Sequence, residues 1–310
     1  MDRTKTLLSL FDSSGFGLEI GPSYSPLLPK SAGYNVETVD HADAAALREK
    51  YKDNASQIEE VDYVSDGRSL LDLIGQPEKY DYIVASHMIE HVTDIIRFLQ
   101  DCETLLKPDG KLLLVVPDKR FCFDALRPLS TVGEALTAFD EKRTRHSPGT
   151  VFDFLNSFVK KGGTTIWADT TLDDMELAHE AAGAKGLYDH AKTSPDYIDV
   201  HAWRFTPSHF RLFVKTLRSL GFIKSGQSAL VTNDDSNLYR FEFYVTLAKN
   251  APVDTMADLD LHRATARELH EIVPAATDRL ADDRLMAALK RSISWRLIRP
   301  LRQLKSRLAR

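Results

Sequence analysis

The stretch GLEIGPSYSP, residues 17–26, joins an apolar strand, an acid and a single glycine, Gly21. Nucleotide-binding turns begin in the same way, but dinucleotide sites continue with further glycines that let the backbone approach a pyrophosphate. Here the letters PSYSP follow the glycine instead. The turn therefore argues against NAD and ATP, and it favours a ligand that has no phosphates.

Apolar strands and helical segments alternate outward from this turn. Strands are expected at residues 16–21, 34–40, 59–67, 80–88 and 107–118. Good helix formers with helical spacing occupy 42–53, and an amphipathic helix is expected at 93–106 with Thr93 or Asp94 as its cap. Such alternation is typical of βαβ units, so it predicts an α/β fold with a doubly wound, Rossmann-like sheet.

A mixed stretch rich in aromatics, glycines and acids interrupts the alternation at residues 121–200. A helix is then expected at 206–222, with Thr206 as its cap. The two strands near 228–232 and 239–248 are separated by turn-like residues, and they should pair as an antiparallel hairpin. The interruption therefore looks like an insert in one sheet domain.

The expected organisation is one α/β domain at 1–250, with its insert at about 121–200, and a helical tail at 251–310. Eight Lys and Arg residues and no acid lie in 290–310, whereas 1–289 hold 32 basic and 45 acidic residues, a net charge of −13. An acidic body argues against nucleic acid as a partner. The basic tail could lie on an anionic membrane surface, dock on a glycan-assembly partner, or be a solvated end.

Cysteine content and hydropathy indicate the compartment. The chain has two cysteines, Cys102 and Cys122, which form no metal-type pair and are typical of a reducing environment. No apolar run approaches the roughly 20 residues of a membrane span, and the first residues lack a signal-peptide cleavage site. We expect a cytoplasmic protein, peripheral at the inner face of the membrane if the basic tail binds lipid.

Five segments occur in an order and spacing that resemble one known family. They are LEIGPSYSP (18–26), VETVDHAD (36–43), YVSDG (63–67), YDYIVASHMIEHV (80–92) and LLKPDGKLLLVVPD (105–118). The set resembles class I S-adenosylmethionine-dependent methyltransferases over roughly residues 15–120, and the closing helix and hairpin extend the resemblance to about 248. It implies a seven-stranded sheet of the methyltransferase type, a methyl-transfer activity, and S-adenosylmethionine as the cofactor.

The resemblance assigns donor-binding roles to residues at the strand ends, where ligands of such sheets bind. The expected residues are Glu19, Gly21, Asp40, Asp66, Gly67 and Ser86. The first two would line the methionine and ribose end, Asp40 would accept from the ribose hydroxyls, and Asp66 would accept from the adenine amino group with the glycine beside it. The serine would lie near the sulfonium. The alternative is an unrelated α/β protein with ordinary acids at its strand ends.

The segment SHMIEHV, residues 86–92, places His87, Glu90 and His91 on one face if it turns helical. Imidazole and carboxylate ligands together suit Mn, Fe, Co, Zn or Mg, and His201 is the best candidate for a fourth ligand. The arrangement resembles small-RNA 2′-O-methyltransferases and ubiquinone-pathway O-methyltransferases, which carry acid-x-x-Glu-His here; His87 replaces the first acid. The alternative is that these groups only support the cofactor and the following helix.

Transfer of a methyl group to a hydroxyl requires loss of the hydroxyl proton. A metal bound to two neighbouring hydroxyls could lower the pKa of one of them. Without a metal, a histidine must act as general base. We expect His201 and His91 as the catalytic residues, with His146 and His190 of the insert as second choices.

The acceptor is indicated by resemblance alone. PDKRFCFDALRPLST (117–131) and HAWRFTP (201–207) resemble segments of bacterial methyltransferases linked to surface-polysaccharide assembly, and SISWRLIRPLR (292–302) resembles a tail or linker of glycosyltransferases from such pathways. The implied function is O-methylation of a sugar hydroxyl in a surface polysaccharide or its precursor. The alternatives are a small aromatic or quinone-like acceptor, an RNA ribose, and a non-catalytic partner that binds S-adenosylmethionine.

Overall fold

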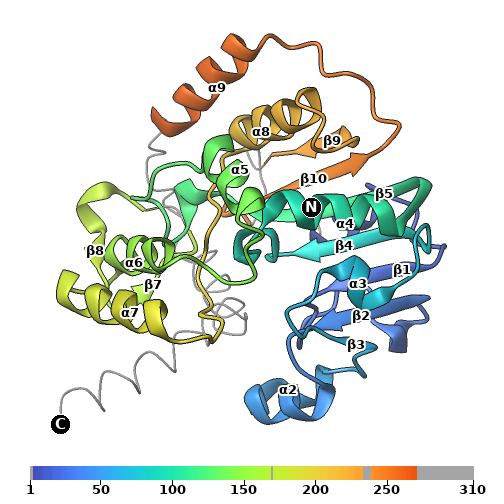
Figure 1. Cartoon of the computed structure of the whole chain (residues 1–310), viewed down its shortest axis with the longest axis horizontal. Helices are drawn as coiled ribbons and strands as arrows, with labels where there is room; N and C mark the ends of the chain where they lie inside the picture. The colour runs from blue at the N-terminus through green and yellow to red at the C-terminus, as the bar shows by residue number, and fades with distance from the viewer. Residues whose placement is uncertain (1–2, 169, 233–238, 271–310) are drawn as a thin grey trace.

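The computed structural model describes residues 3–168, 170–232 and 239–270, and its centre is a seven-stranded sheet with helices on both faces (Figure 1). The strand order is β3-β2-β1-β4-β5-β10-β9, with β10 antiparallel to both of its neighbours and the other pairs parallel. The strands are β1 (Gly17–Ile20), β2 (Val36–Asp40), β3 (Tyr63–Val64), β4 (Tyr80–Ser86), β5 (Leu106–Pro117), β9 (Gly226–Val231) and β10 (Glu242–Ala248). The predicted Rossmann-like sheet and its closing hairpin are confirmed.

The central strands are buried on both faces, because their sequences are nearly continuous apolar runs. In β5, Leu112 and Leu114 pack beneath the helices of one face, while Leu113 and Val115 pack on the other. The helices that contribute to the first face are α4 (Ile95–Leu105), α5 (Val132–Asp140) and α8 (Pro207–Ser219). The second face is covered by α1 (Arg3–Leu8) and the segment that follows β1. Both apolar faces of the sheet are thereby removed from water.

Two predicted boundaries shift. The helix expected at 42–53 is shorter, since α2 (Ala44–Lys50) gives way to the 3-10 helix η2 (Lys52–Gln57). The strand expected at 59–67 pairs over only two residues of β3, at the edge of the sheet. A short helix, α3 (Leu70–Ile74), then leads to β4. The cap predicted for α4 is Asp94, whose carboxylate accepts from the backbone N–H of Arg97 at 2.9 Å.

Helix α8 begins where the sequence predicts, but its cap comes from elsewhere. Thr206 occupies the cap position, yet its hydroxyl makes no capping bond and, in the described part of the chain, has no hydrogen-bond partner. The backbone N–H of Ser208 instead donates to the Glu268 carboxylate at 3.0 and 3.2 Å. Glu268 lies on α9 (Asp258–His270), so the tail helix completes the start of α8.

The insert forms a lobe of its own beside the carboxyl ends of the parallel strands (Figure 1, green to yellow). Beyond α5 it contains α6 (Pro148–Asn156), β6 (Val159–Lys161), β7 (Thr164–Thr165), β8 (Glu176–Leu177) and α7 (Ala181–Thr193). The three strands form a separate antiparallel sheet of order β7-β6-β8. A second apolar core that includes Phe123, Phe158 and Trp167 holds the lobe together, so these aromatic side chains are largely committed to packing.

The remaining regular elements are single 3-10 turns. They are η1 (Lys30–Ala32), η3 (Ile89–His91), η4 (Lys119–Phe121) and η5 (Leu172–Asp174). The predicted basic segment from residue 290 lies outside the described residues. Among the helices of the described ranges, none has the length and apolarity that crossing a membrane requires.

Candidate functional site

The turn after β1 is held in shape by Glu19. This buried carboxylate accepts from the backbone N–H groups of Leu27 at 2.7 Å and Leu28 at 3.1 Å. Burial raises the pKa of Glu19 to about 7, against the opposing effect of these two hydrogen bonds. Gly21 has a φ of +71°, which favours glycine, and an added Cβ would lie 3.5 Å from the sulfur of Met88. The acid of the opening motif therefore shapes the loop that its glycine begins.

Asp40 ties the end of β2 to the same turn. Its Oδ2 accepts from the backbone N–H of Ser23 at 2.8 Å, and its Oδ1 accepts from the backbone N–H of His41 at 2.7 Å. The His41 ring lies 2.6 Å from the same Oδ1 through Nδ1 and 2.7 Å from the Lys50 ammonium through Nε2. Asp40 is thus buried, and each of its two oxygens already accepts from a group of the chain.

The remaining predicted donor-binding residues lie at the ends of the next strands. Asp66 follows β3, is half exposed and pairs with Arg68, whose hydrogen bonds lower the pKa of this carboxyl. Gly67 beside it has a φ of +90°. Ser86 ends β4, and its hydroxyl accepts from the Arg3 guanidinium at 3.3 Å. Because β3, β2, β1 and β4 are neighbouring parallel strands, the six predicted residues lie in a row along their carboxyl-terminal ends. We call this row the candidate donor-binding edge.

His87 contacts Glu242, a buried acid at the start of β10. Its Nε2 lies 2.7 Å from Oε2 of Glu242, and its backbone φ is +50°, a strained value for a residue with a side chain. Glu242 also pairs with Arg3 at 2.6 and 3.0 Å and accepts from the Tyr244 hydroxyl at 2.9 Å. Although burial disfavours the charged form, Arg3 and His87 lower the pKa of Glu242 to about 2. One nitrogen of His87 is therefore already engaged.

Glu90 is the exception among the buried acids. Its side chain is 2% exposed, and neither carboxylate oxygen has a hydrogen-bond partner in the described part of the chain. Three imidazole nitrogens surround Oε1: Nδ1 of His87 at 3.7 Å, Nε2 of His91 at 3.8 Å and Nε2 of His201 at 4.0 Å. A buried carboxylate without partners is costly unless a cation neutralises it.

Three of the four predicted metal ligands meet here. Ligand atoms of Glu90, His91 and His201 lie within 4.8 Å of one another. Among the described residues, these three form the group of His, Cys, Asp or Glu side chains that is close enough to hold a metal ion. The rings of His91 and His201 are perpendicular, with centroids 4.7 Å apart. His87 faces the group through Nδ1 only. The donor set fits a divalent cation of intermediate hardness.

The two converging histidines are each anchored through their other ring nitrogen. Nδ1 of His91 lies 2.8 Å from Asp199, and Nδ1 of His201 lies 2.5 Å from Asp124. Burial disfavours a charged imidazole, but Asp199 outweighs it and raises the pKa of His91 to about 9. Burial likewise opposes ionisation of Asp124, and the charges of His201 and Arg127 nevertheless lower the pKa of this carboxyl.

The second-choice histidines lie outside this group. His146 is buried with its Nε2 3.3 Å from the Tyr197 hydroxyl, and burial lowers the pKa of its ring to about 4. His190 is exposed on α7. The structure thus brings His91 and His201 together and leaves His190 apart, while His146 adjoins the pair through the Tyr197 hydroxyl, which donates to the carbonyl of His91.

Four residues of the site were missed by sequence reasoning: Asp124, Asp199, Arg3 and Glu242. Asp199 stands two positions before His201, and Asp124 lies in the segment that opens the insert, so an acid close to a candidate ligand was the available signal. Nothing in the local sequence distinguishes Glu242, since its charged partners His87 and Arg3 lie 155 and 239 positions away.

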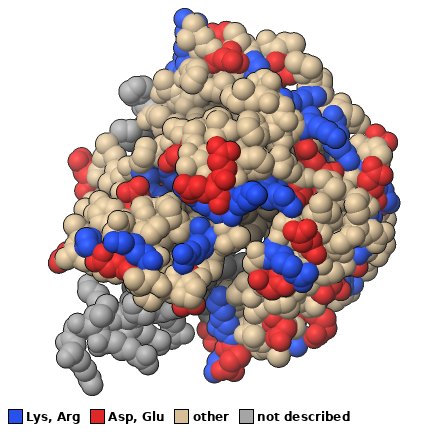
Figure 2. Space-filling view, in the orientation of Figure 1, with Lys and Arg blue, Asp and Glu red and all other residues tan. Residues whose placement is uncertain are grey.

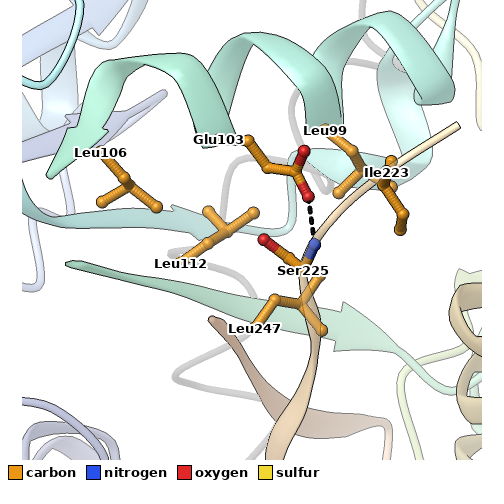
Figure 3. A pocket seen from close by; sticks show the side chains of 7 residues that line it. All are labelled: Leu99, Glu103, Leu106, Leu112, Ile223, Ser225 and Leu247. Atoms are coloured by element: carbon orange, nitrogen blue, oxygen red, sulfur yellow. Dashed lines mark hydrogen bonds between the residues drawn. The ribbon is translucent and has the colours of Figure 1, made fainter. Parts of the chain in front are cut away.

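The cavity between α4 and the strands is unrelated to these groups. Its walls are largely apolar, with Glu103 bonded to the backbone N–H of Ser225 at its rim (Figure 3). Leu106 lies at the start of β5, whereas the site lies at the carboxyl ends of the strands. On the outer surface, charged side chains of both signs gather around the hollow between the insert lobe and the sheet (Figure 2).

Comparison with known proteins decides the family. The model of a methyltransferase domain matches residues 1–213, about two thirds of the chain. This chain belongs to that family. The sheet of this methyltransferase has the strand order described above, and S-adenosylmethionine is the methyl donor that membership implies.

Short stretches of the methyltransferase match curated enzymes. It is 45% identical over 42 residues to the mitochondrial ubiquinone biosynthesis O-methyltransferase of Bos taurus, which is 14% of this chain and 11% of the relative. It is 49% identical over 37 residues to the ubiquinone biosynthesis O-methyltransferase of Haemophilus ducreyi, which is 12% of this chain and 16% of the relative. The chain therefore spans only a small part of the length of the curated relatives it matches.

Solved structures include distant likenesses. The PH0226 protein of Pyrococcus horikoshii OT3 is 14% identical, covers 79% of this chain and 86% of that chain, and gives a TM-score of 0.41. A putative S-adenosylmethionine-dependent methyltransferase of Listeria monocytogenes is 12% identical, and the match covers 79% of this chain and 97% of that protein with a TM-score of 0.42.

Proposed function

We propose that this methyltransferase transfers the methyl group of S-adenosylmethionine to a sugar hydroxyl of a surface polysaccharide or its precursor, assisted by a divalent cation. The observation that carries the proposal is the carboxylate of Glu90, which is buried, lacks partners in the described chain and is ringed by imidazole nitrogens. Such a donor set at the carboxyl edge of the sheet suits O-methylation, because a hydroxyl acceptor must be held and must lose a proton.

The donor would lie along the edge formed by β3, β2, β1 and β4. Gly21 would allow close approach of its amino-acid end, while Glu19 keeps the turn in place. Asp40 would accept from the ribose hydroxyls and Asp66 from the adenine amino group. Gly67 and Ser86 lie beside these contacts.

Glu90, His91 and His201 would hold the cation with one carboxylate and two neutral imidazoles, a set that suits Mn, Fe, Co, Zn or Mg. Bound there, the cation would lower the pKa of a coordinated acceptor hydroxyl and orient it. In the metal-free variant of the proposal, His201 takes the hydroxyl proton as general base. His91 could take this role only at a pH near or above its raised pKa of about 9.

A glycan is proposed as the acceptor on the chemistry of sugars and on the resemblance of two segments. The surroundings of the centre are mixed: carboxylates hold His91 and His201, while the rings of Phe123, Phe154 and Trp167 lie beside His201. Sugars present neighbouring hydroxyls, which two-point binding requires. The resemblance of segments 117–131 and 201–207 to polysaccharide-associated methyltransferases supports the same acceptor class.

The second candidate is a small aromatic or quinone-like acceptor. It is favoured by the short stretches of 45% and 49% identity to ubiquinone biosynthesis O-methyltransferases. An aromatic with two neighbouring hydroxyls would present the same pair of oxygens to the centre. A purely non-catalytic partner role would require that no methyl transfer accompanies donor binding.

One experiment separates these functions. Protein purified without chelator or histidine tag is analysed for bound metal, titrated calorimetrically with S-adenosylmethionine, and tested for methyl transfer to nucleotide sugars, polysaccharide fragments and catechol, each with and without EDTA. The proposal expects a bound divalent cation and EDTA-sensitive transfer to a glycan. Transfer to catechol alone selects the second candidate, and full activity in EDTA without bound metal overturns the metal-assisted mechanism.

A further inference from the structure

We infer that Asp124 and Asp199 are the positioning residues of the two-histidine centre, so that the insert completes the site that β4 begins. This inference rests on the proposed function, because it concerns the same cation. Neither carboxylate is itself a proposed ligand. Their role is to fix which nitrogen of each imidazole is free to bind the cation.

The geometry is the same at both histidines. Asp199 lies 2.8 Å from Nδ1 of His91, and Asp124 lies 2.5 Å from Nδ1 of His201. A carboxylate only accepts, so each Nδ1 must carry the proton. Once the ring is neutral, as a metal ligand must be, Nε2 presents its lone pair, and both Nε2 atoms lie within 4.0 Å of Glu90. His91, whose pKa is raised to about 9, has to release its Nε2 proton when the cation binds. Carboxylates that hold ligating histidines in this way raise metal affinity and fix ring orientation.

Both carboxylates are themselves fixed. Arg127 donates through Nη1 to Asp124 and to the backbone carbonyl of His201, both at 2.7 Å, so the three residues form a closed and buried unit. The Tyr197 hydroxyl lies 3.3 Å from Asp199 and donates to the carbonyl of His91 at 3.0 Å. A carboxylate with a free rotamer would orient nothing, whereas these two have defined positions.

The residues of the centre come from both the sheet domain and the insert, so the centre depends on how these two parts pack together. Glu90 and His91 belong to the turn after β4, while Asp124 opens the insert and Asp199 closes it. The carbonyl of Glu90 also accepts from the backbone N–H groups of Ala202 and Trp203, at 2.7 and 3.2 Å. Both ends of the acceptor-side insert therefore have to dock on the core before two oriented imidazoles face Glu90.

Replacement of Asp by Asn isolates this role, because the side chains have nearly the same shape. The carboxamide of Asp124→Asn or Asp199→Asn can donate to Nδ1, which would move the ring proton to Nε2 and block the cation. Asp199→Glu keeps the acceptor-only chemistry. Asp153→Asn is the matched control, because Asp153 is an exposed acid of the same insert.

The test is a Co²⁺ titration of the full chain, stripped of metal and followed by the visible absorption of the bound ion. Each Asn variant should bind Co²⁺ about 10–100-fold more weakly than the parent protein, and Asp199→Glu and Asp153→Asn should bind more tightly than Asp199→Asn. ¹⁵N chemical shifts of the metal-free protein, recorded above pH 9 so that the ring of His91 is neutral, should show the affected ring turning from Nδ1–H to Nε2–H. Thermal unfolding and S-adenosylmethionine titration establish that each variant is folded.

The outcomes separate the inference from the function on which it rests. Co²⁺ affinity within twofold of the parent in a folded Asp199→Asn protein overturns the positioning role and leaves the metal-assisted function intact. If the parent protein itself binds no Co²⁺, the metal-assisted function fails and the inference fails with it. Should Asp124→Asn fail to fold because Arg127 loses its buried partner, the half-exposed Asp199 still decides the question.

Discussion

The acids along the candidate donor-binding edge and the acid at the candidate metal centre differ in how their hydrogen bonds are satisfied. Glu19, Asp40 and Asp66 each accept hydrogen bonds from groups of the chain. Glu90 is as deeply buried as Glu19, yet its oxygens have no such partner among the described residues. A satisfied carboxylate can hold a loop in shape before any ligand arrives, whereas an unsatisfied one is stabilised only by the ligand. The hydrogen bonds of the edge are already made within the chain, whereas under our proposal the centre is completed by its cation.

Glu90→Gln tests the unsatisfied side of this contrast and should have the largest effect. We expect loss of the bound divalent cation and a decrease in methyl transfer of roughly 100-fold or more, because the charged ligand is gone. The metal-free protein should meanwhile become more stable by about 1 kcal/mol, because no buried carboxylate without hydrogen bonds remains. Metal analysis, turnover and urea unfolding in EDTA measure the three quantities, with exposed Glu49→Gln as control. If Glu90→Gln binds no metal and still turns over at the parent rate, the unsatisfied carboxylate has no role in catalysis.

Glu19 provides a pH test of the satisfied side. Burial raises the pKa of this carboxyl in the folded protein from 4.5 to about 7, so folding favours its protonated form. Its contribution to stability is full below pH 4.5 and is lost as the pH rises through 7. The unfolding free energy of the parent protein minus that of Glu19→Gln should therefore fall by about 3 kcal/mol between pH 4 and pH 8. A difference that is flat with pH would mean that this carboxyl is not held as described.

Asp40→Asn should weaken binding of S-adenosylmethionine about tenfold. The amide cannot accept simultaneously as the carboxylate does from Ser23 and His41, so the turn that faces the donor loses a charge-assisted bond. Calorimetric titration of the donor measures the change, and Glu49→Gln again serves as the control. Equal affinity in the variant and the parent would mean that the preformed edge does not depend on Asp40.

Asp66→Asn should have the smallest effect, about threefold on donor affinity, because this acid is half exposed and solvent screens its charge. The same titration measures it, with the nearby exposed Asp72→Asn as comparison. If Asp66→Asn lost as much donor affinity as Asp40→Asn, the solvent exposure of an acid would not determine how much it contributes to donor binding.

The fold could be predicted because its signals are local. Strands of four to seven apolar residues, an acid or glycine at their ends, and capped helices between them are legible in the sequence, and β1, β2, β4, α4 and α8 lie where these signals place them. The errors fall where a distant segment intervenes. The edge strand β3 pairs with β2 over only two residues, and the cap of α8 comes from Glu268, 60 positions away.

The site could be predicted only in its parts. The spacing of Glu90 and His91, and the position of His201 before a helix, indicate candidate ligands, and the structure brings these three together. His87 shares the spacing, but Glu242 engages one of its nitrogens, and that strand partner has no local signature. Glu19 was expected to line the donor, whereas its oxygens hold the loop beside it. Residue types suggested the chemistry, and burial and hydrogen bonding determined which groups are available for it.

The contact between Glu268 and the start of α8 bears on where this protein can be shortened. A chain ending at residue 250 would leave the N–H of Ser208 without its carboxylate and Arg211 without Asp254, which pairs with it at 2.6 and 2.7 Å. Loss of a helix cap costs about 1 kcal/mol. The helix that would suffer is the one that follows His201 directly. A terminus that keeps both contacts therefore belongs beyond His270, and fusions or tags placed there leave α9 intact.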